Sequence, residues 1–190
     1  MDINARLARR LHSLRLDRRL SMETLASRSG VSRSNISLIE RGQSSPTASV
    51  LDKLASALDV TLAALFEDGD PPAAPSPLAR GGAQPQWTDP VSGYVRRNLS
   101  PASGSPLQLV EVRFPPGQRV AYDTVGRDSE VHQQVWMIEG TLQLTLGEEH
   151  WLLEAGDCLA MQLDRPLAFH NPGRGTARYL VALTQARRHA

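Results

Sequence analysis

The sequence predicts two domains: a bundle of five short α-helices, followed by an all-β domain in which antiparallel strands form a closed or sandwiched sheet. Three observations predict this fold class. Apolar residues recur at helical spacing between residues 3 and 65, a stretch rich in Pro and Gly follows, and short alternating apolar runs fill the remainder. A chain of 190 residues can hold two domains of this kind.

Apolar stripes and capping residues define the five expected helices. Ser21, Ser32 and Thr61 each precede a stripe and can accept hydrogen bonds from exposed backbone N–H groups, and a Pro-Thr pair opens the fourth helix. Gly30 and Gly42 end the second and third helices. The stripes are Ile3, Leu7, Leu11 and Leu14; Met22, Leu25 and Ala26; Ile36 and Ile39; Leu51, Leu54, Ala55 and Leu58; and Leu62 with Leu65.

The domain boundary falls within the segment EDGDPPAAPSPLARGGAQPQ. Its five prolines and three glycines favour extended conformations, and it has too few large apolar residues to bury a surface of its own. We therefore expect a helical domain at residues 1–66, a linker at 67–86 and a β domain at 87–190.

Alternating runs in the β domain are separated by turn signals such as PPG, AGD and NPGRG. We expect residues 87–101 to begin this domain with an edge strand. Many short strands without a long helical segment are typical of a barrel or sandwich. Six further strands are predicted at residues 107–114, 131–138, 141–146, 151–153, 158–163 and 178–183.

Composition excludes several classes of protein. The single cysteine, Cys158, cannot form an internal disulfide and fits a reducing compartment. The amino-terminal MDINARLARR lacks the apolar core of a secretory signal, and no window holds the roughly 18 apolar residues that a membrane span requires. We expect a cytoplasmic protein with no membrane partner.

Charge is distributed unevenly along the chain. Residues 1–66 hold ten basic and six acidic residues, whereas residues 67–190 hold eleven and fourteen, so charges of +4 and −3 give the net +1. Nine arginines fall in the first 41 residues, and guanidinium groups suit forked contacts with phosphates and guanine edges. The asymmetry favours a nucleic-acid partner for the helical domain.

The second and third helices are separated only by the short turn SGVS. Two short helices joined by a Gly turn, with polar side chains on the second, fit the major groove of DNA. A helical bundle without any ligand fits the periodicity equally well. Five residues of the third helix lie on the face opposite Ile36 and Ile39. They are Arg33, Ser34, Ser37, Leu38 and Arg41.

The run LSMETLASRSGVSRSNISLIERGQSSPT at 20–47, with LDKLASALDVTL at 51–62, resembles the XRE family of helix-turn-helix regulators, which is related to phage repressors such as that of phage lambda. The resemblance covers residues 5–66. It implies a compact five-helix domain that binds double-stranded operator DNA, with the third helix in the major groove.

The resemblance also implies roles for individual residues. Met22 belongs to the expected DNA-binding set, but many family members have Gln at this position, so the contact that Gln makes is in question here. Arg15 and Glu40 correspond to an ion pair that ties the first helix to the third. Base edges are assigned to Arg33, Ser34, Ser37 and Leu38, and phosphates to Ser21, Arg41, Gln43 and Ser44.

The β domain resembles the cupin family, a double-stranded β-helix or jelly-roll barrel, through GRDSEVHQQVWMIEGTLQL at 126–144 and EAGDCLAMQLDRPLAFHNPG at 154–173. His132 and His170 lie one residue away from inward positions and should point outward. We therefore expect no metal and no other cofactor. The family's metal-ligand positions fall on Gln133, on Arg127 and Ser129 or alternatively Gly126 and Asp128, and on Leu167.

A barrel without metal can still enclose a small effector, although each inward residue can equally be plain core. The inward side is largely apolar with two amides, which favours an uncharged or weakly polar effector. Arg96 and Arg97 could meet the other domain, a partner subunit or an acidic effector, and solvation at the surface is the simplest expectation. The inward candidates are Gln133, Val135, Met137, Leu167 and Phe169, with Cys158, Ala160 and Gln162 across the barrel.

Together these patterns predict a bacterial transcriptional regulator that is not an enzyme, with a cupin domain that binds an effector and forms a homodimer. Two copies held at a fixed distance would read a palindrome with half-sites roughly 34 Å apart. Two alternatives remain open at this stage. One is a metal-dependent cupin enzyme fused to a DNA-binding domain, and the other is a dimeric DNA-binding adaptor that senses nothing.

Overall fold

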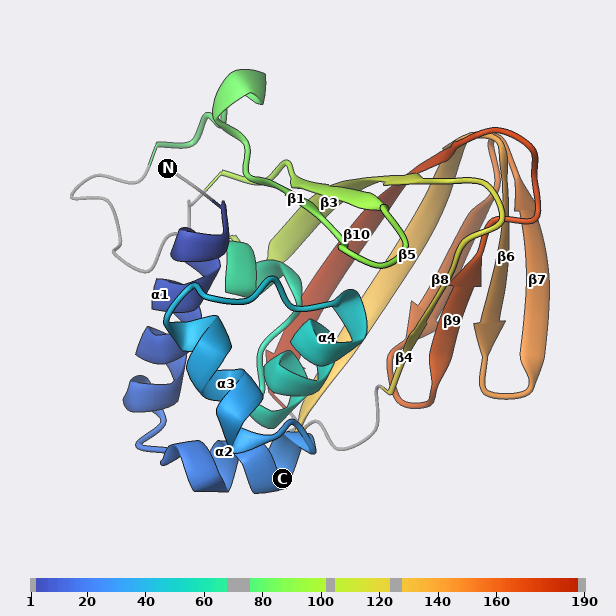
Figure 1. Ribbon diagram of the computed structural model, residues 1–190. Helices are drawn as coiled ribbons and strands as arrows, with labels where there is room; N and C mark the ends of the chain where they lie inside the picture. Colours follow the sequence, from blue (N-terminus) through green and yellow to red (C-terminus); the bar gives the residue numbers. More distant parts are fainter. Residues whose placement is uncertain (1–2, 68–75, 102–104, 124–127, 188–190) are drawn as a thin grey trace.

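A computed structural model of the protein describes residues 3–67, 76–101, 105–123 and 128–187. Helices form one side of the molecule and two antiparallel sheets form the other, with α4 next to the sheets (Figure 1). Within the described residues, no helix has the length and apolar character needed to cross a membrane.

Four α-helices occupy the helical domain: α1 (Ile3–Asp17), α2 (Met22–Ser29), α3 (Arg33–Glu40) and α4 (Ala48–Ala57). The expected fifth helix is wrong, because Ala63–Phe66 is a single 3₁₀ turn, η1. Its backbone bonds span three residues, as from Leu65 N–H to Leu62 O, and all four of its residues are buried. Because one 3₁₀ turn has few backbone hydrogen bonds, packing against the core is the main stabilising contribution to this segment.

Side-chain caps start the helices where the sequence places them. The hydroxyl oxygens of Ser21, Ser32 and Thr47 accept hydrogen bonds from the backbone N–H groups three residues later, at the starts of α2, α3 and α4. Gly30 ends α2 with φ of 67°, a left-handed conformation that costs glycine little. The turn between α2 and α3 is therefore fixed at both ends.

The predicted ion pair between the first and third helices is confirmed. Arg15 Nε and Nη2 donate to Glu40 Oε1 and Oε2 over 2.6 and 2.8 Å, and His12 Nδ1 lies 2.9 Å from Oε2. Both side chains of the Arg15–Glu40 pair are almost fully buried. Burial alone would raise the pKa of Glu40, but hydrogen bonds from Arg15 and His12 lower it by more, to below its ordinary value.

The β domain consists of a six-stranded sheet in the order β1-β2-β3-β10-β5-β8 and a four-stranded sheet in the order β4-β9-β6-β7. Two predicted strands agree with β3 and β6 to the residue, and the hairpin β1–β2 opens the domain with β1 at the sheet edge. The short strands β4 and β9 were not predicted. The strands are β1 (Gln86–Thr88), β2 (Val95–Asn98), β3 (Leu107–Phe114), β4 (Arg119–Tyr122), β5 (Ser129–Glu139), β6 (Thr141–Leu146), β7 (Glu149–Glu154), β8 (Cys158–Gln162), β9 (Leu167–His170) and β10 (Ala177–Arg187).

One hydrophobic core runs through both domains. An aromatic series carries it across the boundary: ring centroids lie 5.6 Å apart for Phe66 and Trp87, 5.7 Å for Trp87 and Tyr94, and 5.5 Å for Tyr94 and Phe114. Rings at these separations contribute attraction beyond the apolar area that they bury. The helical domain therefore packs on the sheets instead of being held only by the chain between them.

Polar groups reinforce the same interface. Asp89, in the turn between β1 and β2, accepts a hydrogen bond of 2.7 Å from Ala48 N–H at the start of α4, and is itself buried. Asn98 Nδ2 donates to Ala63 O over 3.0 Å, and Ser129 N–H donates to Asp59 over 3.1 Å. The orientation of α4 relative to the sheets is thus fixed at several points.

The Arg15–Glu40 pair yields a stability prediction. Glu40→Gln removes the charge and leaves the buried guanidinium of Arg15 without its counterion, so we expect the free energy of unfolding to fall by about 3 kcal/mol at pH 7. Glu23→Gln removes the exposed carboxylate paired with Arg33. This change should alter the free energy of unfolding by less than about 1 kcal/mol. Urea unfolding of both variants measures the difference.

The same pair should show a defined pH dependence. Because the pKa of Glu40 is below its ordinary value of 4.5 in the folded protein, its stabilisation is complete above that pH and is lost as the pH falls through the folded pKa. The stability gap between the parent and Glu40→Gln should therefore narrow below pH 4.5. A gap that stays constant down to pH 3 would contradict this role for the carboxylate.

Candidate DNA-binding face and enclosed cavity

Helices α2 and α3 together form a shallow hollow on the outside of the helical domain. Its volume is about 400 Å³, and every residue that lines it belongs to α2, to α3 or to the position just after α3. Ile36 and Ile39 point the opposite way and are buried in the core. The residues around the hollow are Met22, Arg33, Ser34, Ser37, Leu38 and Arg41.

Charged and polar contacts hold the hollow in shape. Arg33 Nε lies 2.9 Å from Glu23 Oε1, and both side chains are well exposed, so the pair can open without a large energetic cost. Arg41 Nε donates to Gln43 Oε1 over 3.0 Å. Of the expected phosphate contacts, Ser21 caps α2, Gln43 is exposed and Ser44 is half-buried, all close in sequence to the two helices.

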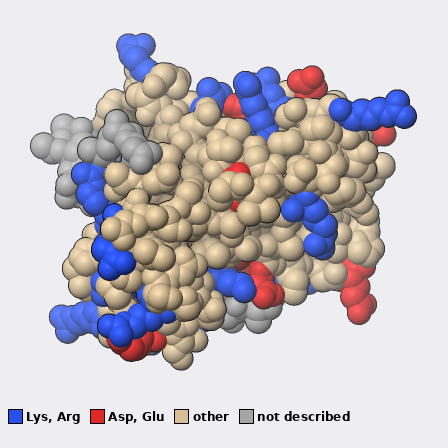
Figure 2. All heavy atoms as spheres, viewed as in Figure 1, with Lys and Arg blue, Asp and Glu red and all other residues tan. Residues whose placement is uncertain are grey.

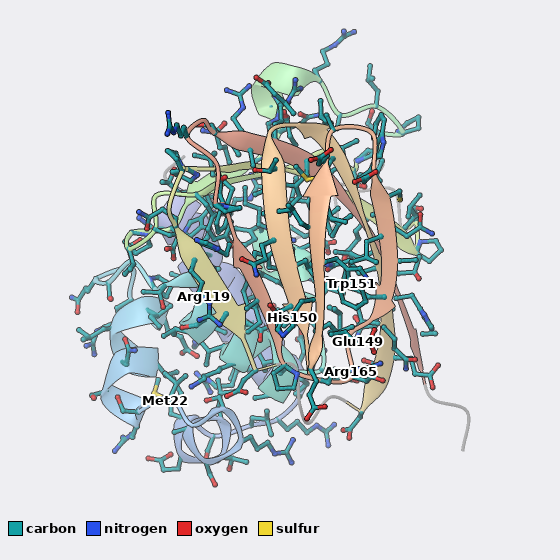
Figure 3. The ribbon with its side chains drawn as sticks, turned by 90° about the vertical axis from the view of Figure 1, so that its right-hand side faces the viewer. Met22, Arg119, Glu149, His150, Trp151 and Arg165 are labelled. Atoms are coloured by element: carbon teal, nitrogen blue, oxygen red, sulfur yellow. The ribbon has the colours of Figure 1, made fainter. Side chains whose placement is uncertain are left out.

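Basic side chains lie over both domains in Figure 2. On the side that the helices occupy, they surround an acidic spot near α2, and Arg33 and Arg41 line the hollow itself. Figure 3 shows Met22 on that domain. The face formed by α2 and α3 is therefore positively charged and open to a large partner.

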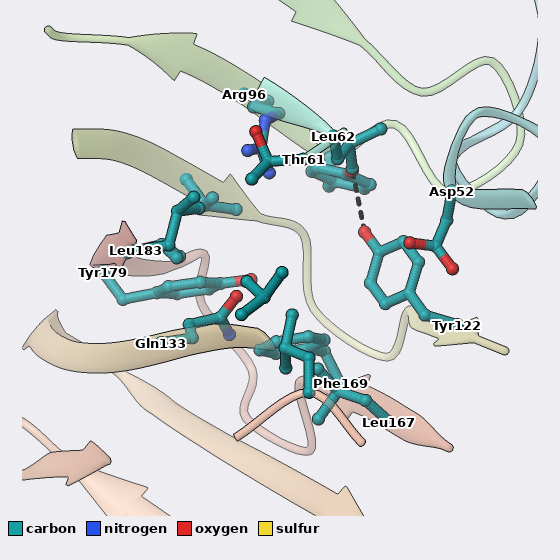
Figure 4. A pocket seen from close by; sticks show the side chains of 15 residues that line it. Asp52, Thr61, Leu62, Arg96, Tyr122, Gln133, Leu167, Phe169, Tyr179 and Leu183 are labelled. Carbon is teal, nitrogen blue, oxygen red and sulfur yellow. Dashed lines mark hydrogen bonds between the residues drawn. The ribbon is translucent and has the colours of Figure 1, made fainter. Parts of the chain in front are cut away.

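A second feature is an enclosed cavity of about 50 Å³ inside the β domain, where the helical domain closes its end (Figure 4). Gln133, Leu167 and Phe169, three of the expected inward residues, line it. Val135 and Met137 also point inward, but they are completely buried in the core and do not reach the cavity.

The expectation that Cys158, Ala160 and Gln162 face inward is wrong. Cys158 pairs with Trp136 across the sheet and Ala160 pairs with Gln134, and directly paired residues of antiparallel strands share a face. Trp136 and Gln134 are exposed, and Cys158 and Ala160 are exposed beside them. The opposite parity of β8 turns Met161 inward instead.

The positions that would hold metal in the cupin family do not meet around an ion. Gln133 and Leu167 line the cavity, while Ser129 donates to Asp59; Gly126 and Arg127 lie outside the described residues. His132 is exposed and His170 bonds Gln143 on the outer face. Across the described ranges, no three His, Cys, Asp or Glu side chains form a group that could hold a metal ion.

Arg96 is the main residue that the sequence places wrongly. It was expected at the surface, but its side chain lines the cavity and is only 7% exposed. Its neighbour Arg97 faces outward and pairs with Glu111, as period-two alternation requires. Three tyrosines also missed by sequence reasoning share the cavity: Tyr94, Tyr122 and Tyr179. The burial of Tyr94 and Arg96 could have been predicted from strand alternation. Both are an even number of residues from Asn98, which is buried, so all three point to the same side of the strand.

Residues from the helical domain close the cavity. Asp52 of α4 and Thr61 and Leu62 of the following turn belong to its lining. Figure 4 shows Thr61 and Leu62 near Arg96, and Asp52 beside Tyr122. A single space is thus bounded by both domains, which the sequence pattern could not reveal because it depends on how the domains pack.

Comparison with known proteins agrees with this architecture. Residues 11–65, from the second half of α1 into η1, match the family model described as "Helix-turn-helix". The helical domain is a helix-turn-helix domain of the XRE type. Its second and third helices are α2 and α3, the two that form the hollow.

Relatives resemble the chain over nearly its whole length. The HTH-type transcriptional regulator PuuR of Escherichia coli strain K12 is 27% identical over 179 residues, 93% of each protein. SutR, another HTH-type transcriptional regulator of that strain, is 25% identical over 180 residues, 91% of each. The crystal structure of an HTH_3 family transcriptional regulator from Vibrio cholerae has 23% identity and a TM-score of 0.76, covering 97% of this chain and 98% of that one. The shared fold therefore includes both the helix-turn-helix domain and the β domain.

Proposed function

We propose that this protein is a sequence-specific DNA-binding transcriptional regulator, which acts in the cytoplasm as a homodimer and responds to a small effector held in its β domain. The observation that carries the proposal is the open, basic hollow that α2 and α3 form within the helix-turn-helix domain. A non-enzymatic role is supported by relatives that are named as transcriptional regulators.

DNA reading is assigned to α3. Arg33, at its first turn, can leave Glu23 and donate two parallel hydrogen bonds to a guanine, while Ser34 and Ser37 offer single hydrogen bonds. Leu38 is partly exposed and offers apolar contact, for example to a thymine methyl group. Phosphate contacts from Ser21, Arg41, Gln43 and Ser44 would fix the register without reading sequence, and Met22 would lie at their edge.

Pairing of two copies is assigned to the outer face of the six-stranded sheet. Trp136 is 48% exposed there, and Leu180 on β10 and Ala160 on β8 extend the apolar surface around it. The outer face of the other sheet has one well-exposed apolar side chain, Leu152, among polar contacts: Glu149 pairs with Arg165, and His150 bonds Thr145 (Figure 3). A twofold dimer through Trp136 would set two α3 helices at a fixed spacing.

Effector response is assigned to the cavity that both domains enclose. Gln133, Leu167 and Phe169 supply its β side, and Thr61 and Leu62 its helical side. A molecule that fits better in one docked arrangement than in another would shift the balance between them, and DNA affinity would change by that difference alone.

Selection of bound duplexes from random sequence tests DNA reading. The parent protein should enrich a palindrome, and Arg33→Ala should lose preference at one position of each half-site, by roughly tenfold, because a forked guanine contact is removed. Arg41→Ala is the control. It should weaken binding to all sequences alike and reduce the salt dependence, as expected for a phosphate contact. Equal affinity of Arg33→Ala and the parent for every enriched sequence would contradict the assignment.

Sedimentation of two variants tests the dimer surface. Trp136→Glu should convert the dimer to a monomer, because it places a carboxylate in the apolar interface, and its affinity for the palindrome should fall to that for a half-site. Leu152→Glu makes the same kind of change at a position of the four-stranded sheet that is 58% exposed, and it should stay dimeric. A dimeric Trp136→Glu would remove this face from consideration.

A further inference from the structure

Arg96 is a buried cation with two hydrogen-bonding atoms that no described residue satisfies. Its Nε and Nη2 atoms have no hydrogen-bond partner among the described residues, although the side chain is buried and lines the cavity. Unsatisfied donors on a buried guanidinium are unfavourable for folding, and such an arrangement is retained when the group serves a ligand. We propose that the cavity binds a small monocarboxylate, held by the guanidinium of Arg96.

The two unused atoms specify the kind of anion. Nε and Nη2 lie on one edge of the planar guanidinium, and their N–H bonds run parallel. The two oxygens of a carboxylate match that edge and accept one bond each. A phosphate monoester would bring a second negative charge, and Arg96 is the only Arg or Lys in the described lining of the cavity. One fork and one positive charge favour a singly charged, planar anion.

The rest of the cavity sets the size and shape of the molecule. A volume of about 50 Å³ holds about four water-sized groups, which corresponds to a short aliphatic acid and excludes long chains. Leu167, Phe169 and Leu183 provide an apolar wall for the tail. Burial raises the pKa of Tyr179 well above its ordinary value, so its hydroxyl stays protonated and can donate a hydrogen bond to an anion.

Charges around the cavity favour the same orientation. Asp52 also borders the space, but Figure 4 shows it beside Tyr122, at the far end of the view from Arg96. The carboxylate end of the ligand would therefore meet Arg96, and the uncharged tail would extend away from it. The sequence-based preference for an uncharged effector considered only the inward candidates of the barrel. An acidic effector was one of the alternatives given for Arg96 and Arg97.

A groove outside the cavity provides an approach. Tyr122 and Leu167 line both spaces, so these two side chains separate the cavity from a surface groove of about 370 Å³ between α4 and β4. Lys53 and Arg119 lie on opposite sides of the groove, with one acidic residue, Asp123, among its lining. Rotation of Tyr122 or Leu167 would connect the groove to Arg96, and the net positive charge attracts an anion.

Isothermal titration at pH 7 with acetate, propionate and butyrate, together with propionamide and inorganic phosphate, tests the site directly. The parent should bind a short carboxylate saturably, and propionamide and phosphate should bind at least about tenfold more weakly, because charge-assisted hydrogen bonds to the fork are lost or mismatched. Absence of saturable carboxylate binding, or equal binding of the amide or of phosphate, would overturn the proposal.

Two variants and a control locate the binding. Arg96→Met should abolish carboxylate binding, and Arg96→Lys, which keeps the charge but not the fork, should weaken it by at least about tenfold. Arg97→Met, next along β2 but facing outward, should bind like the parent. Without ligand, Arg96→Met should melt at or above the temperature of the parent, because a costly buried charge is gone. Unchanged propionate affinity in both Arg96 variants would overturn the assignment.

The regulatory meaning of the site rests on the proposed function, whereas binding itself does not. DNA affinity of the parent, measured with and without propionate, separates the two. Carboxylate binding without any DNA binding would refute the regulator while leaving the ligand site in place. DNA binding without carboxylate binding would refute only the site.

Discussion

The aromatic contact between Phe66 and Trp87 is the constraint on which the arrangement of the whole molecule depends. It joins the end of the helix-turn-helix domain to the first strand of the β domain, and Tyr94 and Phe114 continue the series into the barrel core. Because packed interiors resist gradual deformation, the helical domain cannot slide on the sheets without separating these rings. The position of the DNA-binding face relative to the cavity is therefore set by a core that both domains share.

What the sequence predicted correctly is mostly local. Capping by Ser21 and Ser32 depends on atoms within one turn, and the buried stripe of Ile36 and Ile39 depends on helical periodicity alone, so both could be seen in the sequence. The strand Leu107–Phe114 was equally visible, because a long β-prone run between turn residues leaves few alternatives. The grouping of residues from α2 and α3 into one exposed hollow follows from the same local rules.

What the sequence did not predict depends on tertiary packing. The parity of β8 is set by its pairing with β5, so Cys158 faces solvent although it begins a largely apolar strand. Residues expected in a fifth α-helix, such as Ala63, form a 3₁₀ turn instead. The segment is short, and it packs on β2, where Asn98 donates a hydrogen bond to Ala63 O. Arg96 belongs to a basic pair, which is typical of a surface. Strand alternation turns it inward, and the helical domain covers that end of the cavity, so Arg96 is buried. Each of these features needed a partner distant in sequence.

Helix α4 connects the two sites physically. Asp89 of the β domain caps its first turn, and Asp52 in its middle borders the cavity. The helix also packs against both β4 and α2, and α2 forms one side of the hollow. A ligand at Arg96 would change DNA affinity only if it favoured one docking of α4 over another, and a tenfold change in affinity requires a preference of about 1.4 kcal/mol. One well-aligned, charge-assisted hydrogen bond, made in only one of two arrangements, is worth about that much. A single contact with the buried guanidinium would thus be sufficient for the proposed response, without a large movement of the shared core.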